Sequence, residues 1–315
     1  MKAREYIIRC QEEWAENQGQ GLPLIGSEAV KGRKTFVRPE AEVEESRNFF
    51  EPMTEAVSEQ IRSGDGGEMK RKGNGEWPAR IEALQSSSAI AVNVFQYWGK
   101  IGKIDEIAAA CGFCILKEDW RVCESLRFEE KFEILDDTNR HPNIDIVIPT
   151  NDESQYRFFA IESKFTEPFS SYEKKPKNHL DGKQSKNSKG LKQKYLEQDG
   201  LWKGIPELKN LARQISPGDC KFERLHAAQL IKHILGLKKK CGGSKSGFRL
   251  LYLWYDAPGE EAMTHREEIA KFEKIAKADR IKFHALTYQE LISKLAKEYR
   301  AEHSNYIKYV TERYL

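Results

Sequence analysis

The sequence lacks any long hydrophobic run, which argues against a membrane-spanning protein. No apolar stretch among the 315 residues approaches the roughly 18 that a transmembrane helix needs. The first residues, MKAREYIIRCQEEWAEN, form a charged helical pattern without the apolar segment of a signal peptide, so we expect no secretion. Charged residues make up 32% of the chain and hydrophobic residues 39%, which suits a folded chain rather than a disordered one. We therefore expect a cytoplasmic protein with no membrane partner.

The chain also has few cysteines and a small net charge. The six cysteines are scattered, and without an export signal we expect reduced thiols rather than a disulfide scaffold. Cys111, Cys114 and Cys123 have no evident fourth zinc ligand, and no base is placed beside a thiol, so we favour neither a zinc site nor a cysteine hydrolase. A formal net charge of +3 does not by itself indicate a nucleic-acid binder.

Hydrophobic spacing divides the chain into an N-terminal arm and one larger domain. Residues 1–78 predict a helix at 4–16 followed by weakly patterned, glycine-containing sequence, and we interpret them as a helical and irregular arm. Residues 79–315 predict a single α/β domain, a mixed β-sheet flanked by helices in the order α-β-β-β-α-β-α-β-α. Its expected helices lie at 79–98, 103–111, 219–237, 262–278 and 288–299, and its expected strands at 127–134, 143–148, 157–165, 248–255 and 282–286.

One segment of this domain is unlike the rest. Residues 170–194 contain eight lysines among serine, glycine, proline and asparagine, a composition that cannot form a core. We expect a mobile basic loop at 170–195. It is either a solvated segment or a source of sequence-independent phosphate contacts to DNA.

The sharpest chemical pattern lies on two predicted strands. Asp145 interrupts an apolar strand, and Glu162 and Lys164 lie two residues apart near the end of another, so that they share one face. A carboxylate buried on a strand is costly unless it is paired or binds a metal. Two such carboxylates beside a lysine suit phosphodiester hydrolysis with a divalent cation, because Mg²⁺ takes one or two carboxylates together with water and phosphate oxygens. Asp145, Glu162 and the Ser163 carbonyl are the expected ligands, and Lys164 is expected to position the attacking water.

Asp145 followed by Glu162-Ser163-Lys164, in this order of elements, resembles the PD-(D/E)xK nuclease superfamily, which has the restriction-endonuclease-like fold. Four phrases are also similar to an uncharacterised bacterial family of restriction-type nucleases: QSSSAIAVNVF (85–95), AIESKFTEPF (160–169), HAAQLIKHILGL (226–237) and LLYLWYD (250–256). The resemblance covers about residues 79–300. It implies Mg²⁺ as cofactor, with Mn²⁺ as a substitute, DNA as partner and, by analogy, a homodimer.

The sequence departs from the superfamily pattern in two places. Pro142 precedes Asp145 by three residues rather than one, so Asp136 and Asp137 stay as alternative acids. The RecB-like branch has Gln-x-x-x-Tyr on the helix after the Glu-x-Lys strand, whereas this chain has Gln229 and His233. Gln229 is therefore a candidate for supporting the site, on a polar helix face that is turned either to the site or to water.

Two further groups of acids complete the prediction. Glu82, placed early in the first predicted helix of the domain, matches the position at which many such nucleases add a metal ligand. Glu129, Glu130 and Glu133 on the first strand are expected to form a solvated face. The sequence thus predicts a Mg²⁺-dependent nuclease, most simply a DNA endonuclease of restriction, defence or repair. The alternative is an inactive DNA-binding module on the same fold.

Overall fold

The computed structural model describes residues 1–18, 22–26, 33–37, 48–64, 67–71, 77–116, 121–135, 141–170 and 190–315. Asp136, Asp137 and residues 171–189 of the expected basic loop lie outside the described residues. Within the described ranges, no helix is both long enough and apolar enough to cross a membrane.

A mixed sheet of five strands forms the centre of the protein. Its strands lie side by side in chain order: β3 (Arg127–Lys131), β4 (Asn143–Pro149), β5 (Phe158–Lys164), β6 (Phe248–Trp254) and β7 (Phe283–Thr287). β3, β4 and β5 are antiparallel, and β6 and β7 run parallel to β5. The central strands β5 and β6 are buried along almost their whole length, because helices cover both faces of the sheet.

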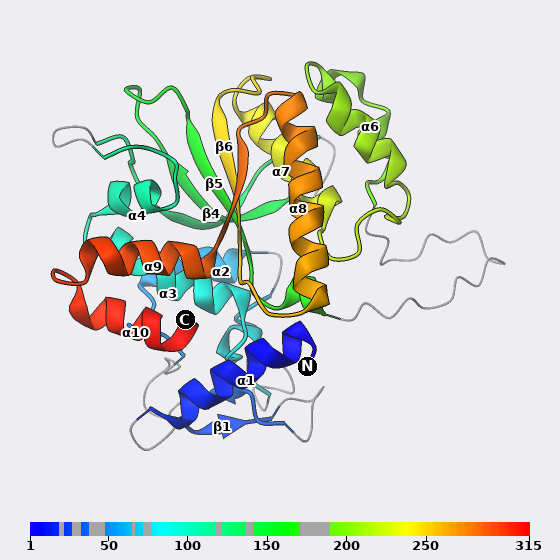
Figure 1. Ribbon diagram of the computed structural model, residues 1–315. Helices are drawn as coiled ribbons and strands as arrows, with labels where there is room; N and C mark the ends of the chain where they lie inside the picture. The colour runs from blue at the N-terminus through cyan, green and yellow to red at the C-terminus, as the bar shows by residue number, and fades with distance from the viewer. Residues whose placement is uncertain are drawn as a thin grey trace.

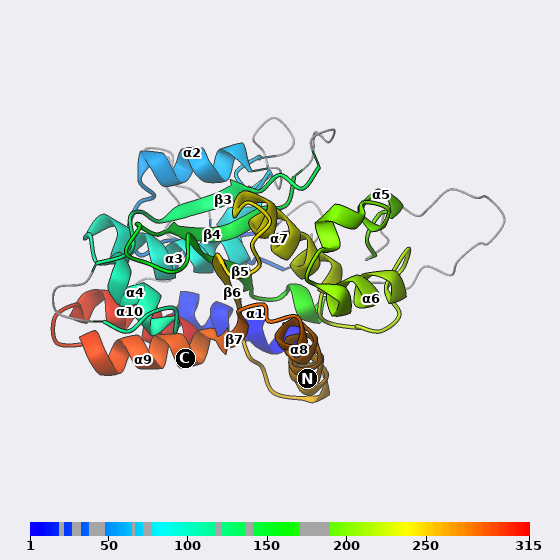
Figure 2. The ribbon, with the colours of Figure 1, turned by 90° about the horizontal axis from the view of Figure 1, so that it is seen from above.

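Two layers of helices enclose this sheet (Figures 1 and 2). On one face lie α3 (Ser87–Lys100) and α9 (Tyr288–Tyr299), with α4 (Ile104–Ala110) packed against both. On the other face lie α7 (Ala227–Lys240) and α8 (Glu260–Ala278), flanked by α5 (Gln193–Leu196) and α6 (Pro206–Gln214). The structure therefore confirms the predicted mixed sheet flanked by helices.

The remaining elements lie around this core. α1 (Ala3–Glu16) and α10 (Ser304–Tyr314) pack together, and α2 (Glu55–Ser63) lies along the edge strand β3. β1 (Leu24–Ile25) and β2 (Phe36–Val37) form a small separate ladder. Short 3-10 helices occur at η2 (Arg80–Glu82), η3 (Glu167–Phe169) and η4 (Asp199–Trp202). The sequence did not predict α5, α6 and α10.

Two predicted helices begin later than expected. The helix predicted at 79–98 is instead a 3-10 turn followed by α3, which begins at Ser87 because the Ser86 hydroxyl caps it by accepting from Ala89 N at 3.2 Å. The helix predicted at 219–237 begins only at Ala227. Before it, the Glu268 carboxylate accepts hydrogen bonds from the backbone N–H groups of residues 223–225, and these donors are therefore not available to a helix.

A buried arginine joins the N-terminal and C-terminal parts of the chain. The Arg313 side chain is only 2% exposed and donates to Asn48 O at 2.7 Å, Asn48 Oδ1 at 2.5 Å and Gln11 Oε1 at 3.1 Å. Its guanidinium also lies 4.1 Å from the centre of the Trp14 ring. Ile7 of α1 belongs to the same hydrophobic cluster as the core helices. The division at residue 78 stays a prediction, but the described residues on its two sides pack closely.

Replacing Arg313 with methionine should lower the free energy of unfolding by at least about 3 kcal/mol. Methionine keeps an apolar stem but removes every donor, and each buried acceptor left without a partner costs about 1–3 kcal/mol. Urea denaturation of the purified proteins measures the change. Arg300→Met at the exposed end of α9 is the matched control and should stay within about 0.5 kcal/mol of the natural protein. Equal stabilities of the two variants would contradict the role of Arg313.

Candidate active site

Two carboxylates meet where the β4–β5 ladder ends. The last paired residues are Ile146 and Ile161, so Asp145 and Glu162 occupy the next position on their strands. There the Asp145 Oδ2 atom accepts a hydrogen bond from the Ser163 backbone N–H at 2.7 Å. The end of the ladder therefore brings together the acids that the sequence predicted, on two neighbouring strands.

Glu162 is completely buried, at 0% exposure, between two nitrogen groups. Its Oε1 lies 2.5 Å from Lys164 Nζ and its Oε2 lies 2.8 Å from His233 Nε2. Burial alone would raise the pKa of Glu162, but Lys164 and His233 outweigh it and lower the pKa to about 2. The carboxylate is therefore an anion at neutral pH, although it lies in the interior.

Lys164 is the cation of the site. Burial alone would lower the pKa of this lysine, but the Glu162 and Asp145 carboxylates raise it well above its usual value. The ammonium group is therefore charged at neutral pH and acts as a hydrogen-bond donor rather than as a base. Its side chain as a whole is 14% exposed.

Asp145 behaves in the opposite way to Glu162. Burial is the main cause that raises its pKa well above the usual range, and the negative charge of Glu162 adds to the effect. Lys164 and the Ser163 N–H lower the pKa only in part. Asp145 consequently holds a proton at a pH where an ordinary aspartate is ionised. A cation placed between Asp145 and Glu162 would offset the part of this shift that comes from the charge of Glu162.

Glu129 also belongs to this site, and the prediction that it lies on a solvated face is wrong. The β3–β4 pairing places it opposite Asp145, and cross-strand partners share one face of a sheet. Its backbone has φ = 52°, in the left-handed region, and its Oε2 accepts from Asn143 Nδ2 at 3.2 Å. Burial, together with the charge of Glu162, raises the pKa of Glu129 to about 7. Glu133, in contrast, is exposed as predicted and pairs with Lys239 at 3.4 Å.

The α7 helix supplies the other wall of the site. His233 is 1% exposed and reaches Glu162, so this part of the helix faces the site rather than water. Gln229 is half-buried one helical turn earlier, and its backbone N–H donates to the capping His226 Nδ1 at 3.1 Å. Lys232, which the sequence analysis did not single out, is half-buried. Burial lowers its pKa, while Glu162 acts in the opposite direction.

Glu82 makes its contacts away from Asp145 and Glu162. It lies in the 3-10 turn η2 rather than in the predicted helix, where its Oε2 accepts from Ala79 N at 2.6 Å. Its Oε1 pairs with Arg71 Nη2 at 2.5 Å. Both oxygens therefore have local partners, and these contacts account for Glu82 without a metal.

The donor groups fit a hard cation with few protein ligands. Among the described residues, no three His, Cys, Asp or Glu side chains are grouped to hold a metal, and the six cysteines are free. Mg²⁺ needs only one or two carboxylates, because it retains several waters. Each oxygen of Glu162 has one nitrogen neighbour, Lys164 Nζ or His233 Nε2, and a carboxylate oxygen can accept more than one contact. Glu162 and Asp145 therefore can also coordinate a cation.

Asp145→Asn should stabilise the protein in the absence of metal by about 1 kcal/mol or more at pH 7. The raised pKa means that ionised Asp145 opposes folding at any pH above the ordinary value near 4, and asparagine resembles the protonated acid. Urea denaturation with a chelator at pH 7 and at pH 4 tests this. The gain should shrink at pH 4, where the natural Asp145 is protonated in the folded state and about half protonated in the unfolded state. A loss of stability at both pH values would contradict the expectation.

Comparison with known proteins places the chain in a family. Residues 10–315 match the model of a family described as Restriction Endonuclease associating with ARP. No curated protein and no solved structure matches the chain at a significant level. The family model covers almost the whole sequence, including the sheet, the carboxylates at its centre and both flanking layers of helices. The chain therefore belongs to the family of restriction endonucleases associating with ARP.

Proposed function

We propose that the protein is a Mg²⁺-dependent endonuclease that hydrolyses phosphodiester bonds of DNA. The observation that carries the proposal is the meeting of Asp145, Glu162 and Lys164 at adjacent strand ends, with one lysine charge between two carboxylates. Family membership supports a nuclease-like role, and the order α3-β3-β4-β5-α7-β6 is the one expected of a restriction-endonuclease-like core. Mn²⁺ is expected to replace Mg²⁺ in this site.

Asp145, Glu162 and the Ser163 carbonyl would hold the ion. When bound, the ion supplies a Lewis acid that lowers the pKa of water and neutralises charge on the phosphate. Because Glu162 is anionic already, its charge is available without loss of a proton. Asp145 gives up its proton as the site fills, so binding of the ion releases a proton to solvent.

Lys164 would position the attacking water. The ammonium group is charged beside the two acids, so it would donate a hydrogen bond to the nucleophile or to a non-bridging phosphate oxygen. A charged lysine cannot accept the proton that the water loses. The carboxylate on the same face whose pKa lies near neutrality is Glu129, and we infer that the proton leaves toward this side of the site.

The α7 residues would support these groups. His233 fixes the orientation of Glu162 from behind, in the place where the RecB-like pattern has tyrosine. Gln229 and Lys232 lie on the adjoining turn, where an amide and a cation suit contacts to the DNA backbone. The lysines of the basic loop would add contacts of the same kind. By analogy, two copies of the chain would cut the two strands.

An inactive DNA-binding module is the second candidate. Under it, the buried Glu162–Lys164 pair is a structural ion pair and DNA contacts come from the basic segments alone. The position of Asp145 beside this pair favours the enzyme, because a structural ion pair between Glu162 and Lys164 does not need a second buried acid whose pKa is raised. The family description also names an association with ARP, and we extend this association to the chain as part of the proposal.

Purified protein should nick or cut supercoiled plasmid DNA with Mg²⁺ or Mn²⁺, and a chelator should abolish the activity. Lys164→Ala and Asp145→Asn should each lower the cleavage rate at least about 100-fold. The first removes the cation that acts on the water and the phosphate, and the second removes a charge that holds the metal ion. Lys282→Ala, at an exposed position before β7, is the matched control and should cleave normally. Agarose gels of supercoiled, nicked and linear DNA follow the reaction.

Calorimetric titration with Mn²⁺ separates the two candidates. Binding that Asp145→Asn abolishes, together with cleavage, supports the enzyme. Absence of both metal binding and cleavage in the natural protein would refute it and favour the binding module. Cleavage that persists in Lys164→Ala would contradict the role given to that lysine.

His233 gives a separate prediction about positioning. His233→Phe fills the space but leaves one oxygen of Glu162 without a partner, so cleavage should fall at least about tenfold. His233→Gln restores a donor and should recover part of the rate. The rate at saturating DNA should change more than the DNA concentration at half-maximal rate, because His233 acts through Glu162. Equal rates for the two variants would show that only the volume of His233 matters.

A further inference from the structure

The two edge strands of the central sheet, β3 and β7, differ in their charged residues. β3, at one edge, has four charged residues in the sequence RFEEK, and α2 lies against it. Charged residues and a covering helix are devices that protect an edge strand from pairing with other chains. β7, at the other edge, has the sequence FHALT, with no residue that is charged at neutral pH and no proline or glycine. α8 and α9 pack against β7, but the strand itself thus lacks the charged side chains that the β3 edge has.

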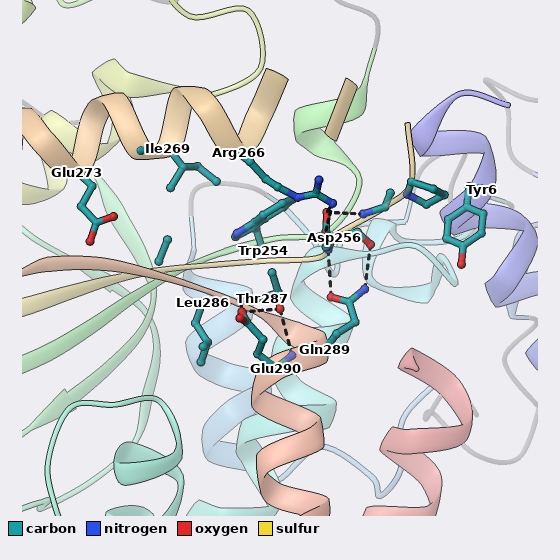
Figure 3. A pocket seen from close by; sticks show the side chains of 14 residues that line it. Tyr6, Trp254, Asp256, Arg266, Ile269, Glu273, Leu286, Thr287, Gln289 and Glu290 are labelled. Carbon is teal, nitrogen blue, oxygen red and sulfur yellow. Dashed lines mark hydrogen bonds and ion pairs between the residues drawn. The ribbon is translucent and has the colours of Figure 1, made fainter. Parts of the chain in front are cut away.

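A cavity of about 700 Å³ opens on the β7 edge between α8 and the start of α9 (Figure 3). Ala285, Leu286 and Thr287 of β7 all line it. Because successive side chains of a strand point to opposite faces, three consecutive residues line one cavity where it opens along the edge or over the end of the strand. Trp254 at the end of β6 lines it too, so the cavity is a groove that runs beside β7 and over the carboxyl ends of β6 and β7.

The backbone of β7 is available within this groove. Lys282 O accepts from Leu250 N of β6 at 2.9 Å, so by alternation Phe283, Ala285 and Thr287 turn their backbone groups away from β6. The Thr287 N–H is occupied, because it donates to Glu290 Oε2 at 2.8 Å. Ala285 is left with its N–H and C=O at the free edge of the sheet.

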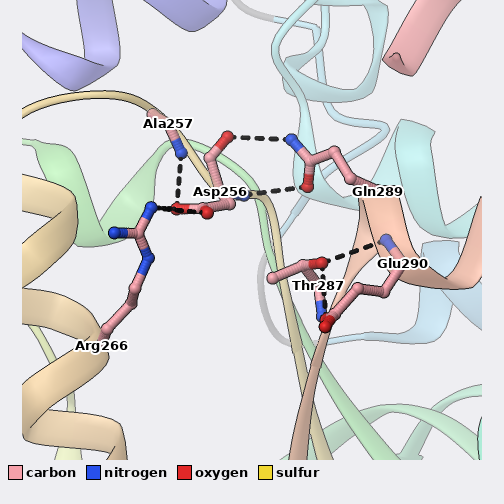
Figure 4. Close-up of polar contacts among 6 residues, drawn as sticks. All are labelled: Asp256, Ala257, Arg266, Thr287, Gln289 and Glu290. Carbon is pink, nitrogen blue, oxygen red and sulfur yellow. Dashed lines mark hydrogen bonds and ion pairs between the residues drawn. The ribbon is translucent and has the colours of Figure 1, made fainter.

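One end of the groove is held rigidly by polar contacts (Figure 4). Arg266 Nη2 pairs with both oxygens of Asp256 at 2.7 and 2.6 Å. The Gln289 side chain clasps the backbone of Asp256, accepting from its N–H at 3.1 Å and donating to its carbonyl at 2.9 Å. Because these polar groups are paired with one another, they define the shape of the groove, and we assign them no contact with a ligand.

The other end presents an acid without a partner. Glu273 reaches from α8 toward β7 (Figure 3), and among the described residues it makes no hydrogen bond or ion pair. Ile269 and Ala270 of α8 line the wall of the groove beside it. An apolar wall, a free strand edge and one uncompensated carboxylate together specify what fits: an extended chain with a basic side chain at one position.

We propose that β7 binds an extended segment of a partner protein as a sixth strand, with a lysine or arginine of that segment paired to Glu273. Main-chain hydrogen bonds to Ala285 would supply affinity, and the charge on Glu273 would set the register. This surface does not depend on the nuclease reaction, because the groove lies at the β7 edge and uses none of Asp145, Glu162 or Lys164.

A capped hexapeptide of alternating lysine and valine, labelled with fluorescein, is the probe. Its anisotropy with the full chain should show saturable binding that Glu273→Lys weakens at least about tenfold, a loss of about 1.4 kcal/mol. Glu267→Lys, on the same helix but outside the groove, is the matched control and should bind within about twofold of the natural protein. Ala285→Pro, which removes the edge N–H, should also abolish binding, with thermal unfolding to confirm that the variant is folded.

Three outcomes would overturn the proposal. The first is no binding of the basic peptide. The second is equal binding of a glutamate–valine peptide, or indifference to Glu273→Lys, since either removes the charge recognition. The third is sedimentation showing that the chain self-associates and that Glu273→Lys abolishes this, which would assign the groove to a second copy. None of these measurements depends on DNA cleavage, so a negative result for peptide binding would not bear on the proposed nuclease activity.

Discussion

The site depends on one constraint, the burial of the Glu162 carboxylate in the centre of a sheet. A charge in that position is stable only because Lys164 lies 2.5 Å away on the same strand and His233 lies 2.8 Å away on α7. The ion pair with Lys164 joins two strand positions, and the contact with His233 joins the sheet to the helix that covers it. The same neighbours keep the carboxylate anionic, whereas burial and the charge of Glu162 raise the pKa of Asp145. Local stability and candidate chemistry therefore rest on the same atoms.

Strand pairing determines what those atoms can do. The β4–β5 ladder stops before Asp145 and Glu162, and there the Asp145 side chain accepts the backbone N–H of Ser163. On the neighbouring strand β3, Glu129 adopts a left-handed backbone conformation, which is rare for a residue with a β-carbon. Such strain persists only where the surroundings impose it, and it often marks a functional position. The group of acids Glu129, Asp145 and Glu162 thus lies where the sheet departs twice from regular geometry, at the end of the β4–β5 ladder and at the left-handed Glu129.

Periodicity and burial cost were enough to predict most of the core. Alternation in residues 143–148 and the apolar run 248–255 are properties of single segments, so strands β4 and β6 could be predicted from the sequence. The same patterns placed Asp145, Glu162 and Lys164 on strands. Glu129 was misread because its orientation depends on register with another strand. The late start of α7 was missed because Glu268, more than 40 residues away, removes the backbone donors that would extend the helix. Long-range contacts of this kind leave no local pattern.

The bond network around Arg313 has a consequence for biosynthesis. α1 precedes every strand of the central sheet in the chain, yet its partners Arg313 and Tyr309 belong to a helix almost 300 residues later. Trp14 packs against Val37 and Leu84, which follow it much sooner in the chain. During synthesis, the contacts of α1 with α10 can therefore form only after all the strands of the sheet have been made.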